Sequence, residues 1–151
     1  MIKEIMSNDF DTIAQIGVNS FIDDDFYRDY KKAGKKGKQT LQEVFFKSID
    51  ICAKYGIANQ IVIDGIPQGF ILGFNYLELK RENPQAFSHF FSSKSKKMIH
   101  NLTEIQNAIE SIIDENSEYI YILSVAVNKE HRGKGLATKL IADLCARYEG
   151  Y

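Results

Sequence analysis

The chain has 151 residues, the length of one ordinary domain, and its 44% apolar content with only two prolines argues against a disordered or fibrous protein. Its 19 basic residues are balanced by 20 acidic ones, so no overall charge would attract nucleic acid or an anionic membrane. No apolar run has the length of a signal peptide or of a membrane span, which needs about 20 residues, and we therefore expect a single cytoplasmic domain over residues 1–151.

The amino-terminal part predicts a short strand followed by a helix. The strand is expected at Ile2–Ile5, and helix caps are available at Ser7–Asp11 before apolar residues that recur through Phe21. The run KKAGKKGK at Lys31–Lys38 is interpreted as a solvated, mobile loop between helices. Its alternative is a contact with phosphate or nucleic acid, together with Lys94–Lys97, which would make binding fall steeply as salt rises.

A second helix and a hairpin follow. Apolar residues at helical spacing from Leu41 to Cys52 predict the helix, and Gly56 supplies a left-handed helix end. The β-branched segment Gln60–Asp64 and the apolar segment Gly69–Tyr76 predict two antiparallel strands. Asp64-Gly65 is the turn signal between them, and the turn residues Gly65–Pro67 set the position of the hairpin.

The chain from Leu77 to Lys97 is polar, with Asn83-Pro84 as a chain breaker, and is interpreted as an irregular excursion. A third helix is predicted from Met98 to Ile112, because apolar residues recur there every three or four positions. Cys52 and Cys145 both lie in apolar helical patterns and are predicted to be buried, reduced packing residues. No cysteine or histidine spacing is typical of a metal site, so none is expected.

The most informative segment combines a strand, a glycine-containing loop and a helix. Glu118–Asn128 reads EYIYILSVAVN and predicts a buried central strand. The loop carries Gly133 and Gly135, and an amphipathic helix begins at Leu136. The first N–H groups of a helix have no internal partners and lie at the positive end of its dipole. This order therefore predicts an anion site, with charge added by Arg132 and Lys134.

The loop satisfies neither a nucleotide-triphosphatase P-loop nor the full dinucleotide fingerprint. Its sequence RGKGLA at Arg132–Ala137 resembles the [RQ]-x-x-G-x-[GA] signature of the GNAT N-acetyltransferase superfamily, and the flanking strand and helix are similar too. The motif-level resemblance covers about residues 119–148. It implies an α+β (mixed α/β) fold, in which a central, mostly antiparallel sheet is flanked by helices.

The resemblance also implies a ligand, acetyl-CoA, and a set of contacts to it. Backbone groups of Val125 and Val127 would pair with the pantetheine arm as an added strand, and the thioester would lie beside Leu123. Amides around the loop would hold the pyrophosphate, which assigns binding to Arg132, Gly133, Lys134, Gly135, Leu136, Ala137 and Thr138.

No catalytic residue follows from the resemblance. Family members that use a glutamate on the fourth strand carry it at the position of Tyr121, and Glu118 and Ser124 are the nearest substitutes. Tyr119 and Tyr121 are predicted to pack on a sheet face. The acceptor is expected to be an amine of a small molecule or a peptide, and its identity cannot be read from the sequence.

The sequence ends at Tyr151, where the family's pattern continues with a fifth strand, a helix and two further strands. Without them the fourth strand would have an open edge. Three explanations remain: a truncated sequence, pairing with the same edge of a second copy in a homodimer, or a natural remnant without activity. An N-acetyltransferase is therefore the leading hypothesis, and a non-catalytic coenzyme A-binding or dimerising module is the alternative.

Overall fold

A computed structural model describes residues 1–93 and 95–148 of the chain. These residues fall into two compact units. One unit contains residues 1–74 together with the described residues from 122 onward, and the other contains residues 75–121. Within the described residues, no helix is long and apolar enough to cross a membrane.

The sheet has four strands in the order β1-β2-β3-β4. β1 is Ile2–Glu4, β2 is Ile57–Ile63, β3 is Ile66–Asn75 and β4 is Ile120–Val127. The first two pairings are antiparallel, and β2 shifts register between Ile61 and Val62. The predicted strands are thereby confirmed, with one correction. Among the described residues β4 is an edge strand of the sheet, and most of its residues are only half-buried. It is therefore not the buried central strand that the sequence predicts.

The hairpin between β2 and β3 turns at Asp64 and Gly65. Both residues have positive φ, 52° and 77°, which is the conformation that a two-residue type I′ turn requires and that Asp-Gly favours. The predicted hairpin and its Asp64-Gly65 turn signal are confirmed, whereas Ile66 and Pro67, expected in the turn, already belong to β3.

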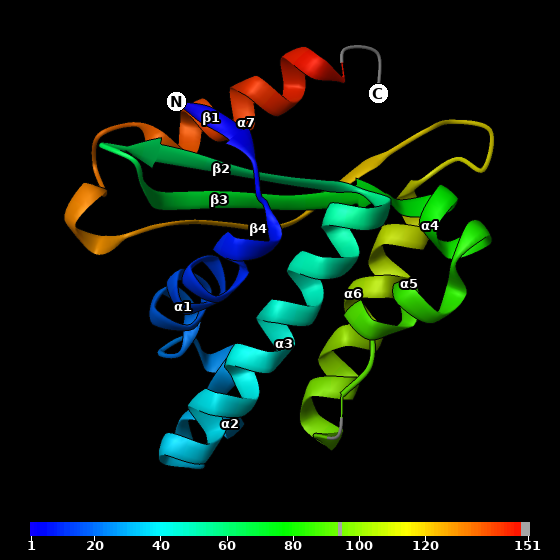
Figure 1. The fold of residues 1–151 in the computed structure, drawn as a ribbon. Helices are drawn as coiled ribbons and strands as arrows, with labels where there is room; N and C mark the ends of the chain where they lie inside the picture. The colour runs from blue at the N-terminus through cyan, green and yellow to red at the C-terminus, as the bar shows by residue number, and fades with distance from the viewer. Residues whose placement is uncertain (94, 149–151) are drawn as a thin grey trace. The chain divides into compact units, whose positions relative to one another are not determined.

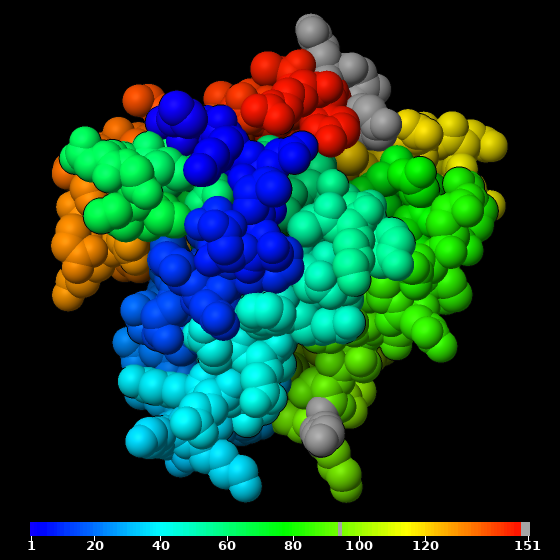
Figure 2. Space-filling model, viewed as in Figure 1, coloured from blue at the N-terminus to red at the C-terminus, as the bar shows by residue number. Residues whose placement is uncertain are grey.

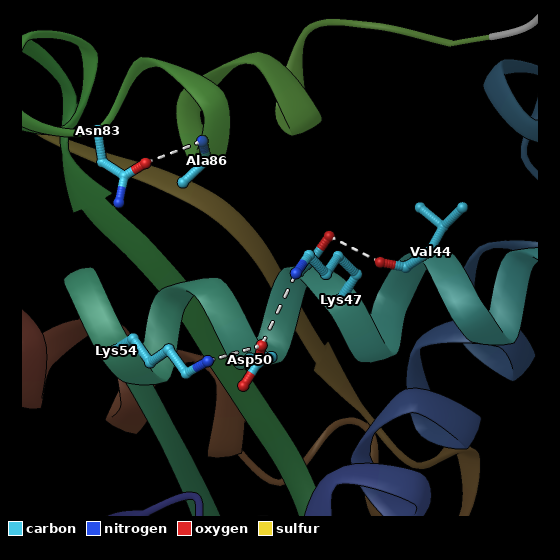
Figure 3. A network of polar contacts seen from close by, with 7 residues as sticks. Val44, Lys47, Asp50, Lys54, Asn83 and Ala86 are labelled. Atoms are coloured by element: carbon cyan, nitrogen blue, oxygen red, sulfur yellow. Dashed lines mark hydrogen bonds and ion pairs between the residues drawn. The ribbon is translucent and has the colours of Figure 1, made fainter.

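Helices cover both faces of the sheet in the first unit (Figure 1). α1 (Phe10–Phe21) follows a short 3-10 turn, η1 (Ser7–Asp9), and packs with α3 (Gly34–Tyr55) against one face, while α7 (Leu136–Arg147) lies on the other. The buried face of α3 includes Leu41 and Ile49, each without exposed surface. On its outer face, Asp50 lies between Lys47 and Lys54 at 4.0 and 3.4 Å (Figure 3).

The interpretation of Lys31–Lys38 as a loop is wrong. η2 (Asp25–Tyr27) leads into α2 (Arg28–Lys32), and α3 begins at Gly34, so nearly the whole run is helical. A Cβ on Gly37 would lie 1.8 Å from the Tyr30 carbonyl oxygen, and the glycine therefore allows the two helices to meet. Lys31 pairs with Asp23 at 2.7 Å. These two helices, light blue to cyan, form part of the surface seen in Figure 2.

Gly56 does not end α3 in a left-handed conformation, because its φ is −150°. Glycine is required there for space: a Cβ would lie 2.4 Å from the carbonyl oxygen of Gly73 on β3. The sequence therefore predicted the correct position for the end of α3. The physical reason for glycine there is space, not the left-handed conformation that was expected.

The second unit is built from three helices, α4 (Tyr76–Glu82), α5 (Pro84–Phe90) and α6 (Lys96–Ile112). The predicted third helix is confirmed as α6, but the predicted irregular excursion is wrong. Asn75 accepts a hydrogen bond from the Glu78 amide and caps α4. Asn83 accepts one from the Ala86 amide, visible in Figure 3, and caps α5.

An aromatic cluster forms the core of this unit. The ring of Tyr76, which has no exposed surface, contacts those of Phe87, Phe91 and Tyr121 at centroid distances of 5.1 to 6.2 Å. Its hydroxyl donates to Glu110 at 3.1 Å, and Lys80 also binds that carboxylate. The prediction that Tyr121 packs is confirmed.

The two cysteines differ. Cys52 is fully buried in α3, and its burial raises the pKa of its thiol to about 12. Cys145 is exposed on α7, so its predicted burial is wrong.

Candidate functional site

The end of β4 is held against β3 by a short polar clasp. The Asn128 amide donates to the Gln68 carbonyl at 2.8 Å, and its side chain donates to the Gln68 side-chain oxygen at 2.8 Å. Next to this clasp, Gly69 lies so close to β4 that a Cβ would be 2.8 Å from the Ala126 carbonyl oxygen. β4 therefore approaches β3 closely just before the predicted loop.

The same contacts define which main-chain groups of β4 face its other edge. The Asn128 amide and the Ala126 carbonyl face β3, and main-chain groups of alternate residues point the same way along a strand. Val127, between them, therefore directs its N–H and C=O to the opposite edge, and so does Val125. Leu123 and Val125 are half-buried, whereas Val127 is 7% exposed.

The loop reverses the chain through a 3-10 turn, η3 (Lys129–His131), and two left-handed glycines. Gly133 has φ 80° and Gly135 has φ 77°, a region that residues with a Cβ rarely adopt. A Cβ on either glycine would meet no atom within 4 Å. Glycine is thus needed here for the backbone conformation, and the space beside it is open.

The loop ends at the amino terminus of α7. Gly135 caps the helix without any side-chain hydrogen bond, and the Lys139 amide donates to the Gly135 carbonyl at 3.0 Å. The amides of Leu136, Ala137 and Thr138 precede the first i to i−4 bond and have no intrahelical acceptor. Their position, at the positive end of the helix dipole, is suited to an anion.

Apolar residues fix the position of α7. Leu136, Leu140 and Leu144 are 8%, 1% and 3% exposed, at the spacing of one helical face. Ala137 is half-buried and Thr138 is exposed, so the first turn is anchored by Leu136 while its outer side remains accessible.

The two basic side chains of the loop have different partners. Arg132 Nε donates to the Val127 carbonyl at 3.0 Å, and one of its terminal nitrogens donates to Ser20 Oγ at 3.3 Å. Lys134 Nζ lies 3.5 Å from His131 Nδ1 and is exposed. Sequence reasoning placed both charges at the loop but missed Ser20, Gln68 and Asn128, because contacts across more than 50 residues leave no local pattern.

The structure does not single out Tyr121, Glu118 or Ser124 as a catalytic residue. Burial raises the pKa of Tyr121, which is therefore protonated at neutral pH and unsuited as a base. Glu118 is exposed and Ser124 is half-buried. Among the described residues, no group of three or more histidine, cysteine or acidic side chains could hold a metal ion.

Comparison with known proteins places this arrangement in a family. The model of the Acetyltransferase (GNAT) family matches residues 25–151, and the chain belongs to that family. No curated protein matches it in sequence. The predicted resemblance and the α+β fold are thereby confirmed.

Two solved structures have the same fold. One, from Corynebacterium glutamicum, is described as a histone acetyltransferase HPA2 and related acetyltransferase; it is 18% identical, with a TM-score of 0.66 over 97% of this chain and 70% of that chain. The other, an N-acetyltransferase from Staphylococcus aureus, is 16% identical, with a TM-score of 0.55 over 97% of this chain and 75% of that chain. At these identities the likeness concerns the fold, and family membership supports acyl transfer in general.

Proposed function

We propose that this chain binds acetyl-CoA through the loop at 132–138 and the edge of β4, and that it transfers the acetyl group to an amine. The observation that supports this most directly is the pair of left-handed glycines, Gly133 and Gly135, in front of a helix without a side-chain cap. A pyrophosphate offers several acceptor oxygens and negative charge, which match consecutive free amides and a helix amino terminus.

The pantetheine arm would extend the sheet beside β4. Val125 offers both its N–H and its C=O, whereas the Val127 carbonyl already accepts from Arg132. The pairing would therefore use Val125 chiefly, together with the Val127 amide, and would bring the thioester near Leu123.

In the proposed reaction, the unprotonated amine attacks the thioester carbonyl carbon. A C–N bond forms, the C–S bond breaks, the amine loses a proton and the departing thiolate gains one. Acetyl-CoA supplies an activated acyl group, and the protein contributes orientation of both reactants. The raised pKa of Tyr121 excludes it as the base at neutral pH, and we leave the base unassigned.

Calorimetric titration with acetyl-CoA tests the binding half of this proposal. Gly135→Asp would place a carboxylate beside the pyrophosphate. Two unit charges about 5 Å apart repel by about 1–3 kcal/mol for effective dielectric constants between about 80 and 20, which corresponds to a loss of affinity of about 5- to 160-fold. Gly135→Ala tests the backbone strain alone.

Gly65→Asp is the matched control, because Gly65 also has φ 77° and open space for a Cβ but lies in the β2–β3 turn. We expect Gly65→Asp to bind acetyl-CoA like the wild type. Equal affinity of Gly135→Asp and the wild type would contradict the proposal, as would no binding by the wild type.

A second candidate is a coenzyme A-binding module that does not turn over, or one that pairs with a second copy through β4. It is favoured by the position of β4 at the end of the strand order in the described chain. Binding of acetyl-CoA without release of a free thiol in the presence of a panel of amines would support this module and would contradict the enzyme. Sedimentation analysis would distinguish a monomer from a dimer, and Val125→Pro, which removes an edge amide, should abolish edge pairing.

A further inference from the structure

The guanidinium of Arg132 joins three segments that are far apart in the sequence. It extends from the loop, donates through Nε to the carbonyl of Val127 at 3.0 Å, and donates through a terminal nitrogen to Ser20 Oγ at 3.3 Å. Val127 is the last residue of β4, and Ser20 lies in the last turn of α1. One planar side chain thus connects the loop to a strand and to a helix.

The segments that receive these bonds are themselves well fixed. Val127 is 7% exposed, and the neighbouring Asn128 is held to Gln68 by two hydrogen bonds. α1 packs on α3 and buries Ile16 and Val18, which are 3% and 2% exposed. Arg132 therefore connects the loop to rigid parts of the first unit.

The backbone of Arg132 lies immediately before the first left-handed glycine. Arg132 is extended, with φ −70° and ψ 152°, and Gly133 follows with φ 80°. Glycine populates several backbone conformations with similar ease, so two glycines alone would not hold the loop in one of them. A side-chain contact at the start of this segment restricts the conformations that it can adopt.

We propose that Ser20 and Arg132 are positioning residues, which together form a brace that holds the loop amides in the conformation needed to receive the pyrophosphate. The expected effect of the brace on acetyl-CoA binding rests on the proposed function. The existence of the brace does not. Arg132 acts through its geometry, and Lys134, whose ammonium is exposed, supplies the charge next to the phosphates.

A variant that keeps the positive charge distinguishes two possible roles of Arg132, which are positioning of the loop and attraction of the phosphates. Lysine keeps the charge but cannot donate from two nitrogens fixed in one plane. If Arg132 is a brace, Arg132→Lys should weaken binding nearly as much as Arg132→Gln. If Arg132 instead contributed charge to the phosphates, Arg132→Lys would retain most of the affinity.

Hydrogen exchange of the hydrogen-bonded amides on either side of the loop, measured in the protein without coenzyme, tests the brace directly. The amides of His131 and Arg132 donate to the carbonyls of Asn128 and Lys129, and the amide of Lys139 donates to the carbonyl of Gly135. We expect Ser20→Ala to accelerate exchange at these amides about 3- to 10-fold, the range expected when a hydrogen bond to a charged group is lost at a partly exposed site. Ser20→Thr, which keeps a hydroxyl, should restore slow exchange. Asn19→Ala is the matched control, because Asn19 precedes Ser20 in α1 and accepts a bond from Gln15 that does not involve the loop.

Titration of the same variants with acetyl-CoA provides the second readout, and Ser20→Ala should raise Kd by a similar factor. Unchanged exchange in Ser20→Ala, or equal acceleration in Ser20→Ala and Ser20→Thr, would overturn the brace. Weaker binding with unchanged exchange would also overturn it, because Ser20 would then act on the coenzyme directly. If the wild type does not bind acetyl-CoA at all, the proposed function fails, and the exchange measurement still decides whether the brace exists.

Discussion

Replacing Gly69 by alanine inserts a methyl group where β3 and β4 approach closely. The new Cβ would lie 2.8 Å from the Ala126 carbonyl oxygen, 3.1 Å from a Val127 methyl carbon and 3.2 Å from an Ile61 methyl carbon. The nearest of these atoms belongs to the backbone and cannot rotate away, so β4 must move.

Overpacking of this kind costs about 1–3 kcal/mol, and the smaller entropy of the unfolded alanine chain offsets roughly 0.4–1 kcal/mol of it. The expected net loss of about 1–2 kcal/mol corresponds to a Tm lower by roughly 2–8 °C for a chain of this size. Because β4 carries the Val127 carbonyl that receives Arg132, we also expect faster exchange of the hydrogen-bonded amides of His131, Arg132 and Lys139, which flank the loop.

Gly56→Ala separates the two effects. Its Cβ would meet the Gly73 carbonyl at 2.4 Å, close to the end of β3 that does not contact the loop. Gly56→Ala should lower Tm at least as much, while leaving exchange of the amides of His131, Arg132 and Lys139 close to that of the wild type. Differential scanning calorimetry and hydrogen exchange measure both quantities. A Gly69→Ala protein with the Tm of the wild type would refute the reasoning.

Three further predictions concern the second unit and the thiols. The hydrogen bond from Lys80 holds the pKa of Glu110 below its usual range. The stabilisation that this carboxylate contributes is therefore present above its unfolded pKa and is lost as pH falls through its folded pKa. In urea unfolding, the free energy of unfolding of Glu110→Gln should be lower than that of the wild type near pH 7, by less than about 1 kcal/mol, and the two should converge in acid. Tyr76→Phe, which leaves the ring but removes the buried hydroxyl, should cost about 1 kcal/mol, and an unchanged urea midpoint would count against that bond. A thiol reagent should modify Cys145 in the native protein and Cys52 only after unfolding, because Cys52 is fully buried with a pKa near 12; modification of both at one rate would contradict this.

Local patterns in the sequence were sufficient for most of the sheet and for the loop. Asp64-Gly65 specifies a turn by its backbone preference, and the β-branched segments around it specify strands. Gly133, Gly135 and the apolar spacing from Leu136 onward likewise describe a loop and a helix amino terminus, and the structure has both. Each of these signals depends on residues a few positions apart.

The errors had different causes. The glycines of the lysine-rich run were interpreted as loop residues, but a Cβ on Gly37 would lie 1.8 Å from the Tyr30 carbonyl oxygen, so glycine permits the close approach of α3 to α2. Asn83-Pro84 was interpreted as a breaker, although asparagine at a helix cap followed by proline in the first turn begins α5. That signal was available in the sequence. The partners of Arg132 were not, because Ser20 lies 112 residues away.

The most direct test of the central claim is a titration of isotope-labelled protein with coenzyme A, followed by the amide resonances of residues 133–138. We predict that these amides shift first and most strongly, together with the amides of Val125 and Val127. Gly135→Asp should need about 5- to 160-fold more coenzyme A to reach the same shifts, while Gly65→Asp should titrate like the wild type. Shifts that spare the loop, or a Gly135→Asp titration that matches the wild type, would contradict the assignment of this loop as the pyrophosphate site.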